Sequence, residues 1–122
     1  MPNNKKILVV DDEIDLLDLF CFGFEDLGYE VFRASSVDEA FNLLKTQKID
    51  YLLSDLNVNN DSGLDLVDNY NNLSNKNHLK GIFIMTGFDE VDYDKYLEKG
   101  VSKVFIKPMT HIDVDQFIST LA

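Results

Sequence analysis

Short apolar runs and longer amphipathic segments alternate along the chain. The runs are mostly continuous rather than alternating with polar residues, which is typical of strands covered on both faces. They lie at residues 7–10, 31–32, 51–53, 82–85 and 104–106. Between and after them, apolar residues recur with helical spacing over 14–27, 37–44, 64–70, 91–97 and 114–121. The pattern predicts an α/β domain in which five parallel strands are joined by right-handed crossovers and covered by helices on both faces.

Local signals support these helix boundaries. Ser36 precedes the second helix, and Glu39 follows three residues later, as in a capping box. Gly28 and Gly100 come just after the first and fourth helices, where a left-handed terminating residue is favoured. The asparagine-rich stretch 69–77 is expected to be a helix end that runs into a surface loop.

Composition narrows the class of protein. With 122 residues, 45% of them hydrophobic and 27% charged, we expect a single folded domain over 1–122. The lone Cys21 excludes a disulfide framework and fits a buried helix position, and two histidines are too few for a zinc centre. The histidines, His78 and His111, fit solvated loop or helix-start positions.

The net charge of −11 argues against nucleic-acid binding, and no apolar run is long enough to span a bilayer or to act as a signal peptide. We therefore expect a cytoplasmic protein.

Polar residues follow four of the five predicted strands. They are Asp11, Asp12, Asp55, Thr86 and Lys107. Because the carboxyl ends of parallel strands meet at one edge of the sheet, these side chains are expected to lie together. Crowded carboxylates with room for water suit Mg²⁺, lysine can pair with phosphate oxygens, and an aspartate can form an aspartyl phosphate. The set therefore predicts a metal-assisted phosphoryl acceptor.

Each of these residues also has a structural interpretation. Asp11 or Asp12 could cap the first helix, and Asp55 could belong to a turn. Lys107 could be a surface lysine and Thr86 part of a turn with Gly87. The joint arrangement at one sheet edge favours the functional interpretation.

Taken together and in this order along the chain, these residues resemble the motifs of the receiver domain of bacterial two-component response regulators. Asp11-Asp12 follow KILVV, Asp55 follows DYLLS, Gly63 comes eight residues later, Thr86 follows GIFIM and Lys107-Pro108 follow KVFI. The resemblance covers about Lys5 to Leu121. It implies a flavodoxin-like sheet of order 2-1-3-4-5 and a cis peptide bond before Pro108.

The resemblance also implies roles for the site residues. Asp55 would accept a phosphoryl group from a phosphohistidine of a sensor kinase or histidine phosphotransfer protein. Asp12, Asp55 and the backbone carbonyl of Asn57 would bind Mg²⁺ directly, and Asp11 would bind it through water. Lys107 would contact the phosphoryl oxygens, and Thr86 would move to donate a hydrogen bond to them.

The expected output is a change at the face formed by the fourth helix, the fifth strand and the fifth helix. We expect a stand-alone receiver without an output domain, monomeric or weakly dimeric, that signals by protein contact and catalyses only its own phosphorylation and dephosphorylation. The fourth helix is acidic, which suits a basic downstream partner or a solvated face equally well. Its acidic residues are Asp89, Glu90, Asp92 and Asp94.

Three positions depart from the family pattern. The position of the usual switch aromatic holds Val104, with Phe105 next to it. Asn59 replaces a common proline, and the following residues predict a flexible polar loop. Gly87 replaces a common alanine and widens access to the acceptor, while the bulky Phe88 is expected to impede attacking water.

Three other functions fit the sequence less well than phosphoryl acceptance does. A phosphorylation-independent interaction module would be favoured by loss of an acceptor or metal ligand, and none is lost. A phosphatase resembling the haloacid dehalogenases needs a second aspartate two residues after the nucleophilic one. Here those positions after Asp11 and Asp12 hold Glu13 and Ile14. A flavodoxin-like electron carrier needs a Ser/Thr/Gly phosphate loop, which the acidic residues here would oppose.

Overall fold

The computed structural model describes residues 4–87 and 92–121, in which five parallel strands form a single sheet. The order is β2-β1-β3-β6-β7, which is the predicted order 2-1-3-4-5 of the main strands. The fold class is confirmed. The strands are β1 (Lys6–Val10), β2 (Glu30–Ala34), β3 (Tyr51–Asp55), β6 (Gly81–Thr86) and β7 (Lys103–Ile106).

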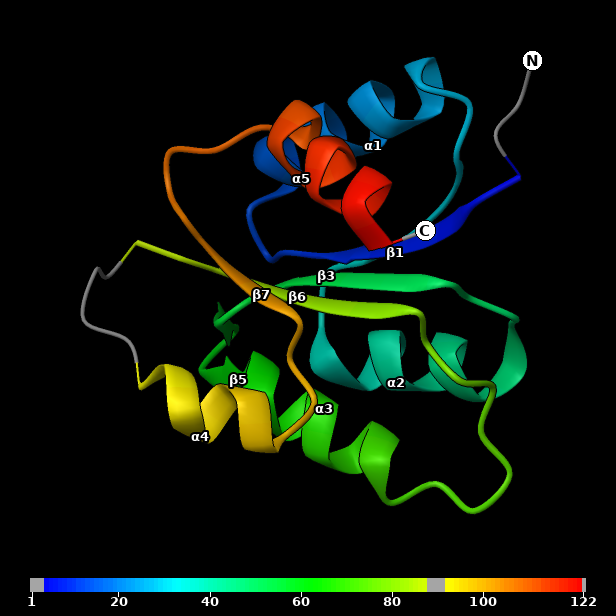
Figure 1. Cartoon of the computed structure of the whole chain (residues 1–122), viewed down its shortest axis with the longest axis vertical. Coiled ribbons are helices and arrows are strands. Elements are labelled where there is room, and N and C mark those ends of the chain that lie inside the picture. The colour runs from blue at the N-terminus through cyan, green and yellow to red at the C-terminus, as the bar shows by residue number, and fades with distance from the viewer. Residues whose placement is uncertain (1–3, 88–91, 122) are drawn as a thin grey trace.

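Helices cover both faces of this sheet. The helices α1 and α5 lie on one face, and α2, α3 and α4 lie on the other (Figure 1). A short 3-10 turn, Ser119–Leu121, follows α5. The helices are α1 (Ile14–Asp26), α2 (Val37–Thr46), α3 (Gly63–Asn71), α4 (Tyr93–Glu98) and α5 (His111–Ile118).

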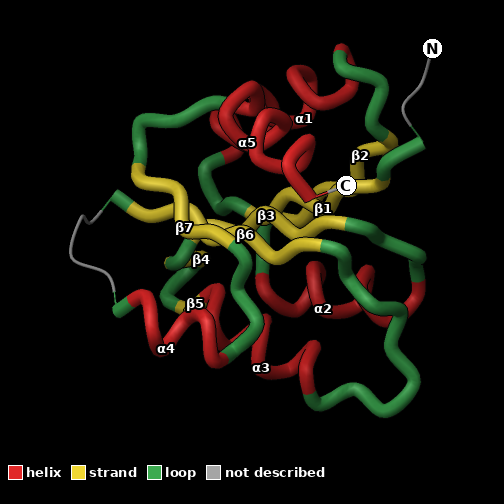
Figure 2. Tube along the Cα trace, viewed as in Figure 1, coloured by secondary structure: helices red, strands yellow, loops and turns green. Residues whose placement is uncertain are grey.

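The end of β3 leads into a small antiparallel hairpin. Its strands are β4 (Asn57–Val58) and β5 (Asp61–Ser62), which are separate from the main sheet (Figure 2). The turn between them has Asn59 and Asn60 at φ of 51° and 69°. Left-handed backbone at both central residues is the geometry of a tight hairpin turn, which asparagine tolerates. The segment expected to be a polar loop thus forms a two-stranded hairpin with a tight turn.

The predicted helix signals occur in the structure with one variation. The Ser36 side chain accepts a hydrogen bond from the Glu39 N–H at 3.1 Å, while the Glu39 carboxylate accepts from the N–H of Ser35 rather than Ser36. Gly28 and Gly100 have φ of 92° and 91°, so both occupy the left-handed region at helix ends.

The sheet separates the core into two layers because successive strand residues point to opposite faces. In β1, Ile7 and Val9 pack with α1 and α5, whereas Leu8 and Val10 pack with the other helices; all four are fully buried. Cys21 is buried among the first group, as predicted.

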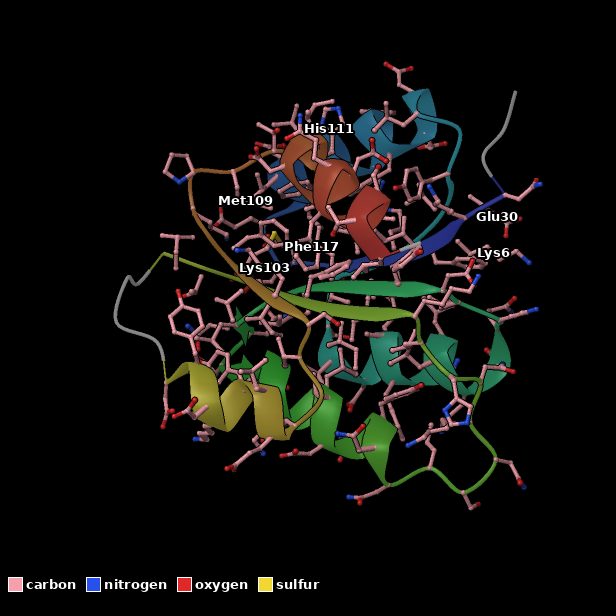
Figure 3. The ribbon with its side chains drawn as sticks, viewed as in Figure 1. Lys6, Glu30, Lys103, Met109, His111 and Phe117 are labelled. Atoms are coloured by element: carbon pink, nitrogen blue, oxygen red, sulfur yellow. The ribbon has the colours of Figure 1, made fainter. Side chains whose placement is uncertain are left out.

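The layer beside α5 is rich in aromatic rings. Phe83 of β6 packs edge-to-face against Phe105 of β7 and Phe117 of α5, with ring centroids 5.9 and 5.7 Å apart. Lys103 places its ammonium 5.9 Å from the Phe117 ring centroid, and both residues are labelled in Figure 3. These contacts hold α5 against the end of the sheet that carries β7.

The two histidines occupy the kinds of position that the sequence suggested. His78 is exposed in the loop after α3. His111 is the first residue of α5, but it is only partly exposed because its ring packs against Phe24 and fills the space beside Gly23, where a Cβ would clash with it. Among the described residues, no helix combines the length and the apolar character needed to cross a membrane.

Candidate functional site

Asp11 and Asp12 lie immediately after β1, at the carboxyl edge of the sheet. Asp11 is fully buried, and its Oδ1 accepts a hydrogen bond from the Glu13 N–H at 3.0 Å. The N-cap residue of α1 is Glu13, whose side chain makes no capping bond. The pair is therefore not the N-cap of α1, although Asp11 does satisfy one backbone donor at its start.

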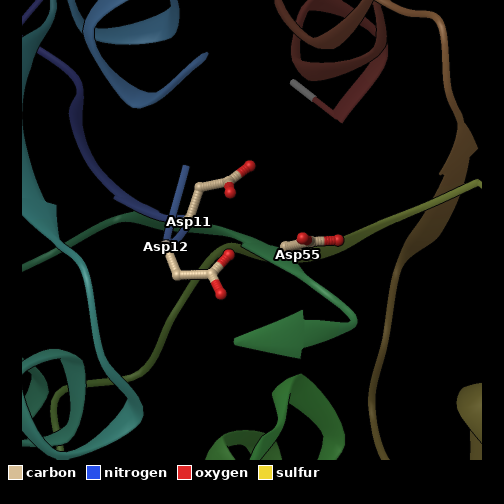
Figure 4. Close-up of side chains that lie close together, drawn as sticks. All are labelled: Asp11, Asp12 and Asp55. Atoms are coloured by element: carbon tan, nitrogen blue, oxygen red, sulfur yellow. The ribbon is translucent and has the colours of Figure 1, made fainter. Parts of the chain in front are cut away.

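Asp55 ends β3 and brings a third carboxylate to the same place. Ligand oxygens of Asp11, Asp12 and Asp55 all lie within 4.8 Å of one another. Figure 4 shows the three side chains close together at the ends of their strands. This convergence follows from the parallel register, because β1 and β3 are neighbours that run in the same direction.

Lys107 provides a positive charge at this cluster. Its Nζ lies 3.4 Å from Asp55 Oδ1 and 3.7 Å from Asp11 Oδ2. The peptide bond between Lys107 and Pro108 is cis. Three carboxylates and one ammonium leave the cluster with excess negative charge, which suits a cation or an arriving cation-bound phosphoryl group.

Burial raises the pKa of the Asp11 carboxyl, although the Glu13 N–H and the charge of Lys107 oppose this effect. Burial also raises the pKa of Asp55, which Lys107 lowers and the nearby charge of Asp12 raises. The neighbouring donors and positive charge thus do not fully offset the cost of burying these two carboxylates in their ionised form. Within the described part of the chain, the buried Asp11 Oδ2 has no hydrogen-bond donor. Three hard oxygen donors, one with an unsatisfied atom, fit a Mg²⁺ ion.

Thr86 and Asn57 border the cluster from two further elements. Thr86 ends β6 and is almost fully buried, and its carbonyl accepts a hydrogen bond from the Lys107 N–H at 2.8 Å. Asn57 begins β4, two residues after Asp55, and is exposed. All six residues singled out from the sequence therefore belong to the carboxyl edge of the sheet or to the hairpin that follows it.

Gly63 lies against the backbone of the acceptor strand. A Cβ at this position would clash with the Asp55 carbonyl oxygen and would come within 3.1 Å of Ser54 Oγ. The Gly63 N–H donates to the Leu56 carbonyl at 2.7 Å, which closes the hairpin loop onto the end of β3. Glycine is required here by close approach, and not by a left-handed backbone.

Sequence reasoning missed the contact between Asn59 and Asp12. The Asn59 N–H donates to Asp12 Oδ2 at 2.9 Å, and its side-chain amide donates to the Ser35 carbonyl at 2.9 Å. Two adjacent asparagines after a short strand are a signal for a tight turn, so the hairpin could have been found from the sequence. The acceptor of the Asn59 N–H, which is Asp12, could not have been found in this way.

Comparison with known proteins agrees with this geometry. The family model for the response regulator receiver domain matches residues 7–119. The chain belongs to the response regulator receiver family. Receiver domains of this family bind Mg²⁺ at an acidic pocket and take part in two-component signalling with histidine kinases or phosphotransfer proteins.

Three relatives illustrate the range of the family. The alkaline phosphatase synthesis transcriptional regulatory protein PhoP of Bacillus subtilis is 32% identical over 97% of this chain and 48% of its own length, so the chain spans about half of that relative. A receiver domain protein of Clostridium thermocellum is 28% identical with a TM-score of 0.83, covering 96% of this chain and 93% of its own. A response regulator of Burkholderia pseudomallei, solved with a phosphorylated aspartic acid, calcium and citrate, is 26% identical with a TM-score of 0.77, covering 98% of this chain and 67% of its own.

The departures from the receiver pattern have structural counterparts. Val104 faces the layer of α2, α3 and α4, whereas Phe105 faces the opposite layer. Gly87 is exposed, and a Cβ there would meet no described atom within 4 Å.

Asp92 caps α4 by accepting from the Lys95 N–H at 3.1 Å, and Asp94 is exposed. Phe88, expected to shield the acceptor, and Asp89 and Glu90, expected on the acidic helix face, lie outside the described residues, as does Val91, the expected first apolar residue of the fourth helix.

Proposed function

We propose that this receiver accepts a phosphoryl group on Asp55 from a phosphohistidine of a sensor kinase or histidine phosphotransfer protein, with Mg²⁺ as cofactor. The observation that carries the proposal is the position of Asp55, whose carboxylate lies 3.4 Å from Lys107 Nζ and within 4.8 Å of ligand oxygens of Asp11 and Asp12. A nucleophile, a cation for the transferred group and ligands for a metal are thus brought together.

The residues present fit the metal. Asp12, Asp55 and the Asn57 carbonyl would bind Mg²⁺ directly, and Asp11 would bind it through water. When bound, Mg²⁺ would neutralise charge on the carboxylates and on the phosphoryl oxygens. This is the condition under which an anionic donor can approach a cluster with excess negative charge.

The chain's own residues would then perform the transfer. An ionised Asp55 oxygen attacks phosphorus, the new O–P bond forms as the P–N bond of the donor breaks, and the electron pair leaves with the imidazole nitrogen. Lys107 moves its ion pair from the carboxylate to the phosphoryl oxygens. The Thr86 hydroxyl donates a hydrogen bond to the same group and draws its loop inward. The chain thereby catalyses only its own phosphorylation and, by attack of water, its dephosphorylation.

We propose that the phosphohistidine partner covers the outward side of α1. Ile14 follows the acidic pair closely and is 51% exposed, and Leu19 and Phe22 are each 66% exposed on the same helix. A cavity of about 230 Å³, lined by Leu16, Leu19, Phe20, Met109, Thr110 and His111, opens between α1 and α5. Exposed apolar side chains on the helix that follows the acidic pair suit a partner that must bring its histidine to Asp55. Replacing Leu19 and Phe22 by serine should slow transfer from a phosphohistidine protein but leave transfer from acetyl phosphate unchanged.

The proposed output is a phosphorylation-dependent protein contact at the face formed by α4, β7 and α5. A cavity of about 140 Å³ lies here, lined by Tyr93, Tyr96, Leu97, Val101, Ser102, Lys103 and Val104. A cytoplasmic location, where the ATP that charges histidine kinases is found, and a monomeric or weakly dimeric state belong to the same proposal.

The test is intact mass spectrometry after incubation with Mg²⁺ and acetyl phosphate. The wild type should gain one phosphoryl group, Asp55→Asn should gain none, and Asp61→Asn, which changes an exposed aspartate of the hairpin, should behave as the wild type. If neither a phosphoryl group nor beryllofluoride binds to the wild type, the chain is a phosphorylation-independent interaction module and the proposal is wrong.

A further inference from the structure

The hairpin after the acceptor contains a backbone donor that the hairpin itself does not use. Asn57 pairs with Ser62 and Val58 with Asp61, so the ladder ends before the two turn residues. The N–H of Asn59 points instead to Asp12, whose Oδ2 accepts it at 2.9 Å. This links a turn to a carboxylate 47 positions earlier in the chain.

A second bond fixes the position of that donor. The side-chain amide of Asn59 donates to the Ser35 carbonyl at 2.9 Å, in the loop between β2 and α2. Asn59 therefore connects three segments: the end of β1 through Asp12, the end of β2 through Ser35, and the hairpin after β3. A proline at this position could make neither bond, since it lacks both the N–H and the amide.

We propose that Asn59 is a positioning residue for Asp12, an inference that rests on the proposed function. By holding one oxygen of the Asp12 carboxylate, it leaves the other oxygen directed to a divalent cation shared with Asp55. Partners of metal ligands restrict the ligand's orientation before the metal arrives, which strengthens binding. Asn59 thus raises the affinity of the site for Mg²⁺ without touching the transferred group.

Two glycine variants separate this role from general effects on the turn. Both Asn59 and Asn60 have a left-handed backbone, which glycine adopts without cost. Only Asn59 has a side-chain hydrogen bond to the described residues. Asn59→Gly removes the anchor to Ser35 and loosens the donor, whereas Asn60→Gly is the matched control.

The experiment measures Mg²⁺ affinity by NMR titration, together with amide hydrogen exchange of the metal-free proteins. We expect Asn59→Gly to lower Mg²⁺ affinity by about tenfold and to speed exchange of the residue 59 amide. Asn60→Gly should match the wild type in both measurements. Asp12→Ala should speed exchange of the same amide. With saturating Mg²⁺, Asn59→Gly should still gain a phosphoryl group on Asp55, because the acceptor and Lys107 are intact.

Equal Mg²⁺ affinity in the two glycine variants would overturn the positioning role, while phosphorylation of both on Asp55 would leave the receiver function standing. A wild type that neither binds Mg²⁺ nor accepts a phosphoryl group would overturn both. A loss of affinity in both glycine variants would assign the effect to the turn as a whole and would also overturn the role of Asn59.

Discussion

Val104 and Phe105 are neighbours in β7 whose side chains lie on opposite faces of the sheet. Val104 packs against the layer of α2, α3 and α4, and Phe105 packs edge-to-face against Phe83 and Phe117 in the layer of α1 and α5. The adjacent aromatic ring therefore cannot occupy the space that a larger side chain at position 104 would fill. The cavity between α4 and β7 occupies that region.

This separation predicts which side chains respond to phosphorylation. When beryllofluoride and Mg²⁺ are added, NMR signals of the Val104 methyl groups and the Tyr96 ring should shift, because both line the cavity at α4. The ring signals of Phe105 should not change, since the sheet lies between it and α4. A large change at Phe105 with none at Val104 would contradict this division between the layers.

Lys107 is expected to affect metal binding and phosphoryl transfer in opposite directions. In Lys107→Met the cluster loses the only cation that contacts it among the described residues, so Mg²⁺ affinity should rise. Phosphorylation by acetyl phosphate at saturating Mg²⁺ should slow by about 100-fold, because the charge on the transferred group loses a partner. Lys103→Met is the control, since that lysine contacts the Phe117 ring instead. A parallel loss of both properties would show that Lys107 only maintains the fold.

The buried charge of Asp11 should make the metal-free protein less stable at neutral pH than a variant with a neutral side chain at this position. The pKa of Asp11 is raised in the folded chain, so the folded state holds this proton more tightly than the unfolded state does. The resulting stabilisation is complete below about pH 4 and is lost as the pH rises through the raised pKa.

Asp11→Asn should therefore increase the free energy of unfolding by about 1–2 kcal/mol at pH 7, with little difference near pH 4. Urea denaturation in the presence of a chelator measures both values. Asp26→Asn, which changes an exposed residue of α1, should stay within about 0.5 kcal/mol of the wild type at either pH. A destabilising Asp11→Asn at pH 7 would mean that the ion pair with Lys107 outweighs burial.

Gly63 is expected to tolerate no side chain. Alanine would push against the Asp55 carbonyl oxygen, so Gly63→Ala should lower the free energy of unfolding by about 1–3 kcal/mol. It should also slow phosphorylation, because the backbone of the acceptor must shift. Gly87→Ala is the matched control: it adds the same methyl group where no described atom lies within 4 Å, and it should leave the fold unchanged. Equal stability of the two variants would contradict the close approach at Gly63.

The sequence pattern was enough to predict the parallel sheet and the convergence of Asp11, Asp12, Asp55 and Lys107, while the order of the strands was implied by the resemblance to receiver domains. Continuous apolar runs separated by helical periods require buried parallel strands, and parallel strands bring their carboxyl ends to one edge. The set of residues found there could therefore be derived without coordinates. The pairing of Thr86 with the Lys107 backbone follows from the same register.

The detailed arrangement of these residues depends on contacts that form only in the folded chain. Burial of Asp11, the contact of Asn59 with Asp12 and the close approach of Gly63 to the Asp55 carbonyl each depend on how separate segments pack against one another. The spacing of apolar residues along the sequence carries no information about these contacts. The pattern of residues determined which groups meet. The packing of the hairpin and helices determined their burial, their spacing and the hydrogen bonds between them.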